Sequence, residues 1–478
     1  MQSSQQFATH YLTLFDGMCA ESAVFGGWVV EGLLDIGKLE HALCRLVAKW
    51  PLLAGRLQQV EKMRYTVKVP HGPFVDGYAP FVITSSTSER PISDFMKHPV
   101  PVVSDVLPLS FFVHSSTPCT TSTWVTQQLP LMFWHLTYFK HRGNEVTCIG
   151  MTVSHALVDG PGMGLIFKAL EAETLGKPWV APPMPHVGDN ENPLQVFLDR
   201  AEKDAASNKE KLPNPVDYPT LGLGGLWFLL SYILFNLWQQ IWHKASMRLV
   251  LLPPEAIDHL VNDCRRAKER DGLKGLDLSS GDILTAWLYK AIYSEEPLGR
   301  RINLCNMVSF RMFPTAGLDN YMHNCFIPNQ YQIFTVAELQ VLPLHVLAAK
   351  IAASKSVTSL SHGLLTYKYL HISAQPSRSL IRVVPYDISP NVDENLTISN
   401  MTTANVVQFD WSGVGGGRTL CRYKKVMSPA PVLATNVVTI SGQLEDGRMV
   451  IDVAVSRRKM KSLEVAISRL IDEHTAEI

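Results

Sequence analysis

Residues 146–164 read VTCIGMTVSHALVDGPGMG. The run from Val146 up to His155 is β-prone and largely apolar, so it predicts a buried strand. The three glycines and the proline of residues 160–164 predict a turn, and residues 165–175 predict a helix. The segment therefore predicts strand, loop and helix, and its loop holds an imidazole and a carboxylate at His155 and Asp159.

The rest of the chain predicts mixed α/β structure in both halves. With 478 residues it exceeds the size at which single cores stop growing, so two domains are expected. Apolar residues recur at helical spacing between Asp35 and Trp50, and Pro51 ends the pattern. The other predicted elements are strands over 247–252 and 301–310, helices after 254 and over 282–293, a hairpin over 436–442 and 449–455, and a last helix from 459.

Composition shifts predict four segments. We expect an N-terminal lobe over residues 1–175, a proline-rich crossover linker over 176–220, an apolar helix over 221–243 and a C-terminal lobe over 244–478. Leu221–Trp242 contains no charged residue, and as a helix it is about 33 Å long, enough to cross a bilayer. It could span a membrane, lie on a membrane surface or be a buried helix, and the sequence leaves all three open.

Charge and cysteine usage narrow the functional class. Lys plus Arg and Asp plus Glu both number 43, so no basic excess favours nucleic acid as a partner. The eight cysteines form no CxxC pair, and no histidine has metal-ligand spacing, so we expect reduced thiols and no metal site. The first residues lack a signal-peptide pattern. These observations favour an intracellular protein, cytoplasmic or membrane-associated.

His155 is the first candidate for chemistry. A neutral histidine can take a proton from an attacking hydroxyl, and its ordinary pKa suits work near neutral pH. The alternative is a hydrogen-bonded structural histidine in a turn. The glycines after it are not followed by Lys-Ser/Thr, so a phosphate-binding P-loop is not expected.

Several motifs, taken together, resemble the BAHD acyltransferases. His155 to Gly160 is similar to their HxxxDG motif, and residues 52–57, LLAGRL, resemble an earlier segment of the same family. Residues 408–413, QFDWSG, resemble the late DFGWG motif in altered form, residues 321–325, YMHNC, resemble YxGN(C), and residues 309–311, SFR, fall where the family has a buried arginine. The chain is thus identified as a member of this coenzyme A–dependent family, in its fungal secondary-metabolite branch.

The resemblance implies an α/β fold with two pseudo-symmetric lobes like those of chloramphenicol acetyltransferase. Each lobe would be a mixed β-sheet with flanking helices, and an active-site channel would run between them. Acyl-CoA would enter from one end and the acceptor from the other. His155 would be the general base for attack on the thioester.

Other site residues are assigned by the same resemblance. Asp159 would be structural and paired with Arg311, and Gly160 would leave room for the channel. Asp410 and Trp411 would brace the channel wall, and Asp410, as the aspartate of the late motif, is also a second catalytic candidate. The cofactor-binding residues are not predicted, except that the basic run of Arg418, Arg422, Lys424 and Lys425 could meet coenzyme A phosphates or be a solvated strand face.

The activity implied is acyl transfer, most readily acetyl transfer, from acyl-CoA to a hydroxyl of a hydrophobic terpenoid- or polyketide-type molecule. Acyl-CoA is then a co-substrate, no bound cofactor is needed, and a monomer is expected. Residues 221–242 could contact a membrane. One alternative is a condensation-type enzyme that uses carrier-protein-bound acyl groups, although those carry a second histidine where this chain has Ser154. Another is an inactive, membrane-associated scaffold with the same fold.

Overall fold

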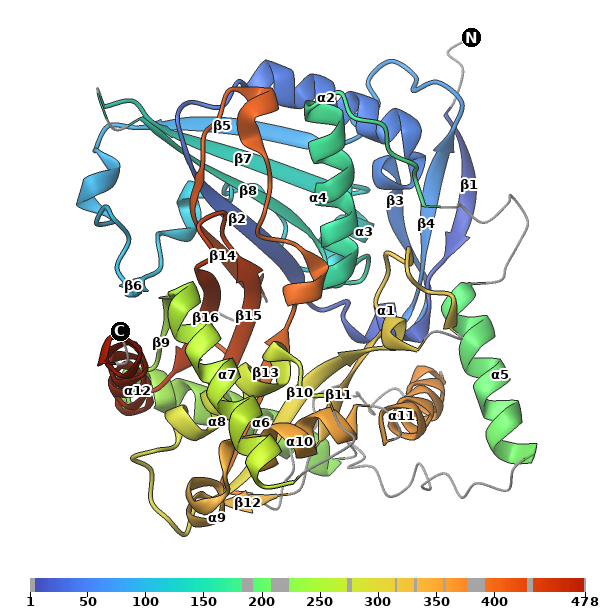
Figure 1. Ribbon diagram of the computed structural model, residues 1–478. Helices are drawn as coiled ribbons and strands as arrows, with labels where there is room; N and C mark the ends of the chain where they lie inside the picture. The colour runs from blue at the N-terminus through green and yellow to red at the C-terminus, as the bar shows by residue number, and fades with distance from the viewer. Residues whose placement is uncertain are drawn as a thin grey trace.

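Two lobes form the molecule in the computed structural model (Figure 1). It describes residues 5–476 except 142, 144, 183–191, 208–222, 273–276, 314–315, 331–332, 356–357, 376–391 and 428–432. The described residues form a five-stranded sheet, an eight-stranded sheet and a small three-stranded sheet. The small sheet has the order β1-β4-β3, and its strands are β1 (Gln6–Tyr11), β4 (Arg64–His71) and β3 (Arg56–Glu61).

The N-terminal lobe is built on the five-stranded sheet, in the order β14-β2-β8-β7-β5. Its strands are β14 (Thr419–Met427), β2 (Ala23–Glu31), β8 (Val146–Ser154), β7 (Met132–Phe139) and β5 (Val82–Ser88). Every residue of β8 is buried, which explains its nearly continuous apolar sequence. In Figure 1, α2 (Ile36–Lys49) and α4 (Gly160–Thr174) lie over this sheet.

The predicted helix after Asp35 is confirmed as α2. The Asp35 carboxylate accepts a hydrogen bond of 3.0 Å from the N–H of Lys38, which caps the first turn. The apolar face of α2, including Leu39, Leu43 and Leu46, is fully buried. Two short helices, α1 (Leu14–Met18) and α3 (Thr121–Thr126), complete this half of the chain.

The C-terminal lobe is built on the eight-stranded sheet. Its main order is β11-β10-β13-β15-β16-β9-β6, with β12 beside β10. The predicted hairpin is confirmed as β15 and β16, and the predicted strands over 247–252 and 301–310 are β9 and β10. The strands are β11 (Phe326–Gln330), β10 (Arg301–Ser309), β13 (Glu394–Asn400), β15 (Val437–Gln443), β16 (Met449–Val455), β9 (Ser246–Leu252), β6 (Val103–Asp105) and β12 (Phe334–Thr335).

Helices pack against this second sheet and around the junction of the lobes. The predicted helices after 254, over 282–293 and from 459 are confirmed as α7, α8 and α12, with starts shifted by at most two residues. Figure 1 also shows α5 and α11 side by side. The helices are α5 (Pro193–Ser207), α6 (Leu223–Ile241), α7 (Pro254–Arg270), α8 (Ser280–Ile292), α9 (Val336–Val341), α10 (Leu344–Ser354), α11 (Thr358–Ala374) and α12 (Arg457–Ala476).

The two large sheets exchange strands. β14 comes from the C-terminal half of the chain, yet it pairs antiparallel with β2, and Lys424 lies opposite Gly26. Conversely, β6 comes from the N-terminal half and pairs with β9. The expected division at residues 243 and 244 therefore does not separate the sheets, because strands far apart in sequence complete each of them.

The expected linker and apolar helix are described only in part. Of residues 176–243, the stretches 183–191 and 208–222 lie outside the described residues. Between them lies α5, whose Leu194 and Leu198 bury an apolar face against the cluster that includes Leu364 of α11. None of the described helices combines the length and apolarity needed to cross a membrane.

Candidate active site

His155 follows the last residue of β8 and is held by both lobes. Its backbone N–H donates to the carbonyl of Ser22 at 2.9 Å, just before β2. Its own carbonyl accepts a 2.7 Å hydrogen bond from the side-chain amide of Asn324, which belongs to the C-terminal half. The main chain on each side of the imidazole is thus fixed, and the ring is buried.

The imidazole of His155 is neutral and oriented. Its Nδ1 lies 3.1 Å from the carbonyl oxygen of Val158, and because a carbonyl only accepts, Nδ1 carries the proton. Burial, and next the positive charge of Lys424, lower the pKa of His155 to about 4. Nε2 is therefore unprotonated at neutral pH, which is the state that a general base requires.

Asp159 and Arg311 form a buried ion pair between the lobes. Arg311 donates to the two carboxylate oxygens of Asp159 at 2.8 and 3.0 Å, so the contact expected from the resemblance is present. Asp159 also caps α4 by accepting from the N–H of Gly162 at 2.9 Å. The pKa of Arg311 is raised, since the attraction of Asp159 and other neighbours outweighs the effect of burial. The Asp159 carboxylate thus accepts hydrogen bonds from Arg311 and Gly162 and is not hydrogen-bonded to His155.

A second buried carboxylate supports the same loop. Asp16 accepts hydrogen bonds of 2.9 Å from the backbone and side-chain N–H groups of Asn324, the residue that also holds the carbonyl of His155. Asp16 further accepts from Thr13 at the start of α1. Burial raises the pKa of Asp16 to about 7 despite these donors. The motif at 321–325 indicated Asn324, but no sequence signal indicated Asp16.

Two further histidines lie behind this loop. His323 Nδ1 lies 2.7 Å from the carbonyl oxygen of Leu157 and so donates to it, which leaves its Nε2 as an acceptor for His10 Nε2 at 2.8 Å. Burial lowers the pKa of His10 to about 4 and that of His323 well below its ordinary value, so both are neutral. No pattern in the sequence indicated that His10 and His323 form a pair, which fixes the middle of the HxxxDG loop.

Gly160 permits a close approach. A Cβ at this position would come within 2.3 Å of the sulfur of Met401. The thioether in turn lies 3.0 Å from the ammonium nitrogen of Lys424. Burial, and next the charge of Arg422, lower the pKa of Lys424 to about 8. The space beside Gly160 is therefore taken by Met401, with a cation behind it.

The late motif lies away from His155. The backbone N–H of Asp410 donates to Glu171 in the last turn of α4, whereas His155 precedes the first turn. The exposed Asp410 side chain caps the short helix Trp411–Val414 by accepting from Ser412 at 3.0 Å. The structure therefore does not bring the Asp410 side chain to His155, and a catalytic role for Asp410 stays a prediction. Trp411 is buried and lies edge-on to Trp28, with 5.6 Å between ring centroids.

The basic residues between Arg418 and Lys425, at the start of β14 and along it, differ in their exposure to solvent. Arg418 is exposed and paired with Glu31, and Lys425 is also exposed. Arg422 is only 1% exposed, so the interpretation as a solvated strand face is wrong for this residue. The period of two along a strand turns alternate side chains to opposite faces, and Arg422 shares the inner one with Lys424.

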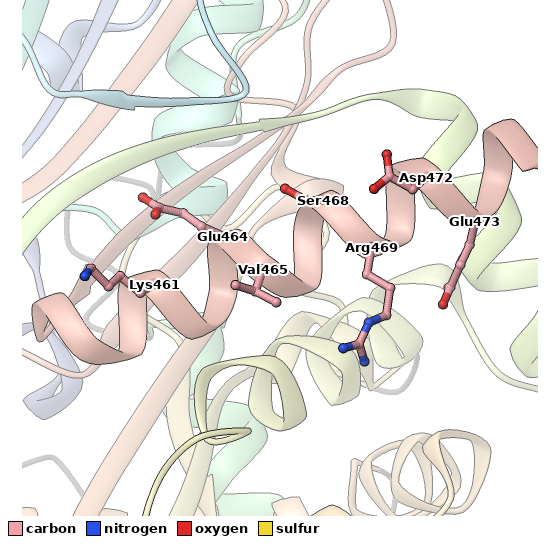
Figure 2. A pocket seen from close by; sticks show the side chains of 7 residues that line it. All are labelled: Lys461, Glu464, Val465, Ser468, Arg469, Asp472 and Glu473. Carbon is pink, nitrogen blue, oxygen red and sulfur yellow. The ribbon is translucent and has the colours of Figure 1, made fainter.

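A surface groove elsewhere takes no part in this arrangement. Figure 2 shows it on α12, lined by side chains between Lys461 and Glu473. None of His155, Asp159 or Arg311 lines it. Within the described residues, no cluster of three or more histidine, cysteine or acidic side chains could hold a metal ion.

Sequence comparison finds related transferases. Residues 31–196 match the family model described as the Transferase family. The O-acyltransferase pboC of Aspergillus ustus is 26% identical over 211 residues, which cover 43% of this chain and 40% of that protein. The transcriptional regulator calD of Penicillium decumbens is 22% identical over 346 residues, 68% of this chain and 65% of the relative. The matches thus span less than two thirds of either relative.

Structure comparison confirms the expected fold class. TRI101 of F. sporotrichioides, solved with coenzyme A and T-2, has a TM-score of 0.64 at 13% identity, covering 96% of this chain and 97% of the other. Apo TRI101 of F. graminearum gives 0.65 at 13% identity, with 97% and 98% covered. Vinorine synthase gives 0.58 at 13% identity, with 98% and 94% covered. At such identities the likeness establishes the two-lobed α/β fold.

Proposed function

We propose that this chain, which belongs to the BAHD-type (HxxxDG) acyltransferase family, transfers an acyl group from coenzyme A to a hydroxyl of a hydrophobic small molecule. Acetyl is the acyl group that we propose, and the acceptor would be a terpenoid- or polyketide-type metabolite. The observation that carries the proposal is His155, whose Nδ1 is tied to Val158 while its Nε2 is unprotonated. The TRI101 structures, solved with coenzyme A and a small molecule, support the choice of co-substrate.

In the proposed reaction His155 Nε2 removes the proton of the acceptor hydroxyl as its oxygen attacks the thioester carbonyl. The tetrahedral oxyanion then collapses, the C–S bond breaks, and the imidazolium returns the proton to the departing thiolate. Asp159, Arg311, Asn324 and Gly160 hold the loop that aims the imidazole. Neither a covalent acyl-enzyme nor a metal enters this scheme.

The test is acyl transfer by the purified protein. Incubation with acetyl-CoA and a panel of apolar alcohols should release free thiol and give acetylated products by mass spectrometry. His155→Ala should lower turnover by ~10²–10⁴-fold. His71→Ala, at an exposed histidine on β4, is the matched control and should retain wild-type turnover. Equal turnover of the two variants would contradict the assignment of His155.

A condensation-type reaction is the rival enzyme activity. A condensation domain shares the fold with a TM-score of 0.52 at 15% identity. Here, however, the residue before His155 is Ser154, whose hydroxyl bonds to Thr121 at 2.6 Å and accepts from the N–H of Ala156 at 3.2 Å. Ser154 is thus used to shape the loop. Transfer from a carrier-protein thioester but not from acetyl-CoA would favour the rival, and folded protein inactive with both donors would favour a scaffold.

We also propose that α6 rests on an anionic membrane surface. The amide side chains in its second half face the protein, since Asn236 accepts from Thr435 and Gln240 donates to Leu433. Among the residues with described burial, Leu234 of α6 is 62% exposed, and Trp242, which directly follows α6, is 72% exposed. The described part of this exposed apolar face consists of Leu230, Leu234, Trp238, Ile241 and Trp242.

Basic residues close to the C-terminal end of α6 indicate that the membrane surface it would contact is negatively charged. Lys244 and Arg457 are exposed beside Trp242, and the N–H of Arg457 bonds to His243. Cations next to an apolar, tryptophan-bearing face suit contact with acidic lipid headgroups. Wild-type protein should float with phosphatidylserine-containing vesicles. Leu234→Ser with Trp242→Ser should abolish flotation, whereas Val465→Ser, an exposed apolar position on α12, should not. Wild-type protein that stays in the bottom fraction of the gradient, apart from the floating vesicles, would refute the contact.

A further inference from the structure

Arg422 is a buried cation with free donors. It lies on β14 opposite Trp28, and its guanidinium carbon is 5.4 Å from the centroid of that ring. Both Nε and Nη1 are buried without a hydrogen-bond partner. Gly26 makes room for the group, because a Cβ there would lie 3.2 Å from Nη2. Buried guanidinium N–H groups are normally all bonded, so unpartnered ones are unusual.

The surrounding charges do not neutralise this arginine and its neighbour. Asp452 is the carboxylate that acts on both Arg422 and Lys424, but the described residues place no carboxylate within ion-pair distance of either cation. One oxygen of Asp452 has no partner, and the other accepts from Ser441 at 3.3 Å. Burial lowers the pKa of Arg422 to about 10, so it stays charged at pH 7. Asp159 also acts on Lys424 but is already paired with Arg311, and burial raises the pKa of Asp452 to about 7, so positive charge exceeds negative charge here.

This excess of positive charge adjoins the reacting position. Lys424 is near enough to His155 for its charge to lower the histidine pKa. Its ammonium contacts Met401, which packs against Gly160 of the HxxxDG loop. Arg422 is two residues from Lys424 on the same face of β14. A substrate group that lies against His155 is therefore close to Lys424, and Arg422 is the next side chain along this face of β14.

We infer that Arg422 and Lys424 bind a carboxylate of the substrate next to His155. The inference rests on the proposed function and deepens it, because it adds one charged group to an otherwise apolar substrate. The carboxylate could belong to the hydroxylated acceptor, with acetyl-CoA as the donor, or to the acyl donor, in which case a dicarboxylic acyl-CoA would replace acetyl-CoA. In both cases the carboxylate oxygens would accept hydrogen bonds from the unpartnered N–H groups of Arg422, and the negative charge would offset that of Lys424.

The experiment measures binding, so that it does not depend on turnover. Calorimetry compares malonyl-CoA with isovaleryl-CoA, whose acyl groups have the same number of heavy atoms but differ in charge. A second pair compares 12-hydroxydodecanoate with its methyl ester. Hydrogen bonds to charged groups contribute about 1.5–3 kcal/mol, so the wild-type protein should prefer the anionic member of one pair by roughly 10- to 100-fold. The pair that shows the preference identifies the source of the carboxylate.

Variants assign the preference to the two cations. Arg422→Met should reduce it to less than about threefold, and Lys424→Met, at a less buried position, provides a second variant with the same expected direction. Arg418→Met, four residues before Arg422 and on the surface, should keep the full preference. Equal or absent binding of both members of both pairs by wild-type protein would overturn the inference, as would a preference that survives in both variants. Acetyl transfer without any anion preference would leave the proposed function standing, whereas an anion preference without transfer would refute only the function.

Discussion

The ion pair of Asp159 and Arg311 gives a quantitative test of how the HxxxDG loop is held. The side chains of Asp159 and Arg311 are 3% and 11% exposed, and they share two hydrogen bonds of 2.8 and 3.0 Å. Arg311→Met strands a buried carboxylate and frees the carbonyl of Tyr321, which also accepts from this guanidinium. Breaking a buried pair in this way costs about 3–5 kcal/mol of unfolding free energy.

The opposite substitution should cost less. After Asp159→Asn the guanidinium keeps the carbonyls of Tyr321 and His323 as acceptors, and the asparagine oxygen still accepts from Gly162. We expect a loss of about 2–3 kcal/mol, the contribution of hydrogen bonds between charged groups. The double variant should lose roughly 2 kcal/mol less than the sum of the two single losses, because neither charge is left alone.

Urea unfolding followed by circular dichroism, with acyl transfer measured on the same samples, checks these values. The matched control is Arg418→Met, which removes a pair with Glu31 that has similar distances of 2.8 and 3.2 Å but lies on the surface, so the unfolding midpoint should hardly change. Strictly additive losses would refute the pairing argument. So would Asp159→Asn with full stability and collapsed turnover, which would indicate a catalytic role for that carboxylate.

Three further outcomes are expected. The pKa of His155 is lowered to about 4, so the base is neutral above that pH. In a pH series, kcat/KM should therefore stay level from pH 8 to about 5 and fall below pH 5. A break in the profile near pH 6.5 would contradict the buried environment of the imidazole. Gly160→Ala should lower thermal stability by about 1–3 kcal/mol because its Cβ collides with Met401, and a Met401→Ala background should remove the penalty; equal losses in both backgrounds would exclude this contact. Asp410→Asn keeps an N-cap acceptor for Ser412, so turnover should stay within about twofold of wild type, and a larger loss would return Asp410 to the chemistry.

The sequence predicted local structure well, but it predicted no strand pairing beyond the hairpin of β15 and β16. Helices such as α2 carry their own spacing and cap, which is why Asp35 marked its start. The pairing of β14 with β2 depends on residues almost 400 positions apart, and no local pattern contains that information. For the same reason the sequence left open whether the basic run meets coenzyme A phosphates or is a solvated strand face, and it did not predict that Arg422 is enclosed once β14 joins the N-terminal sheet.

Some residues of the candidate site could likewise be predicted from the sequence, and others could not. The motif resemblance located His155 and the Asp159–Arg311 contact, because those residue types occur at fixed places in the family pattern. Asp16 was not predicted as a site residue, since an isolated aspartate in a short helix has no distinctive sequence context. The outward face of α6 was also not predictable, because an uncharged segment has apolar residues all round, and only the contacts of Asn236 and Gln240 determine which side turns inward.

The exchange of strands has a consequence for synthesis of the protein on the ribosome. The sheet that carries His155 has its edge at β2 until Thr419–Met427 emerges, late in translation, and pairs there. Until then nine residues of β2 present unpaired backbone groups, which are a template for wrong association. The nascent N-terminal half should therefore depend on chaperones, and when it is produced alone its sheet should lack the strand that completes this edge.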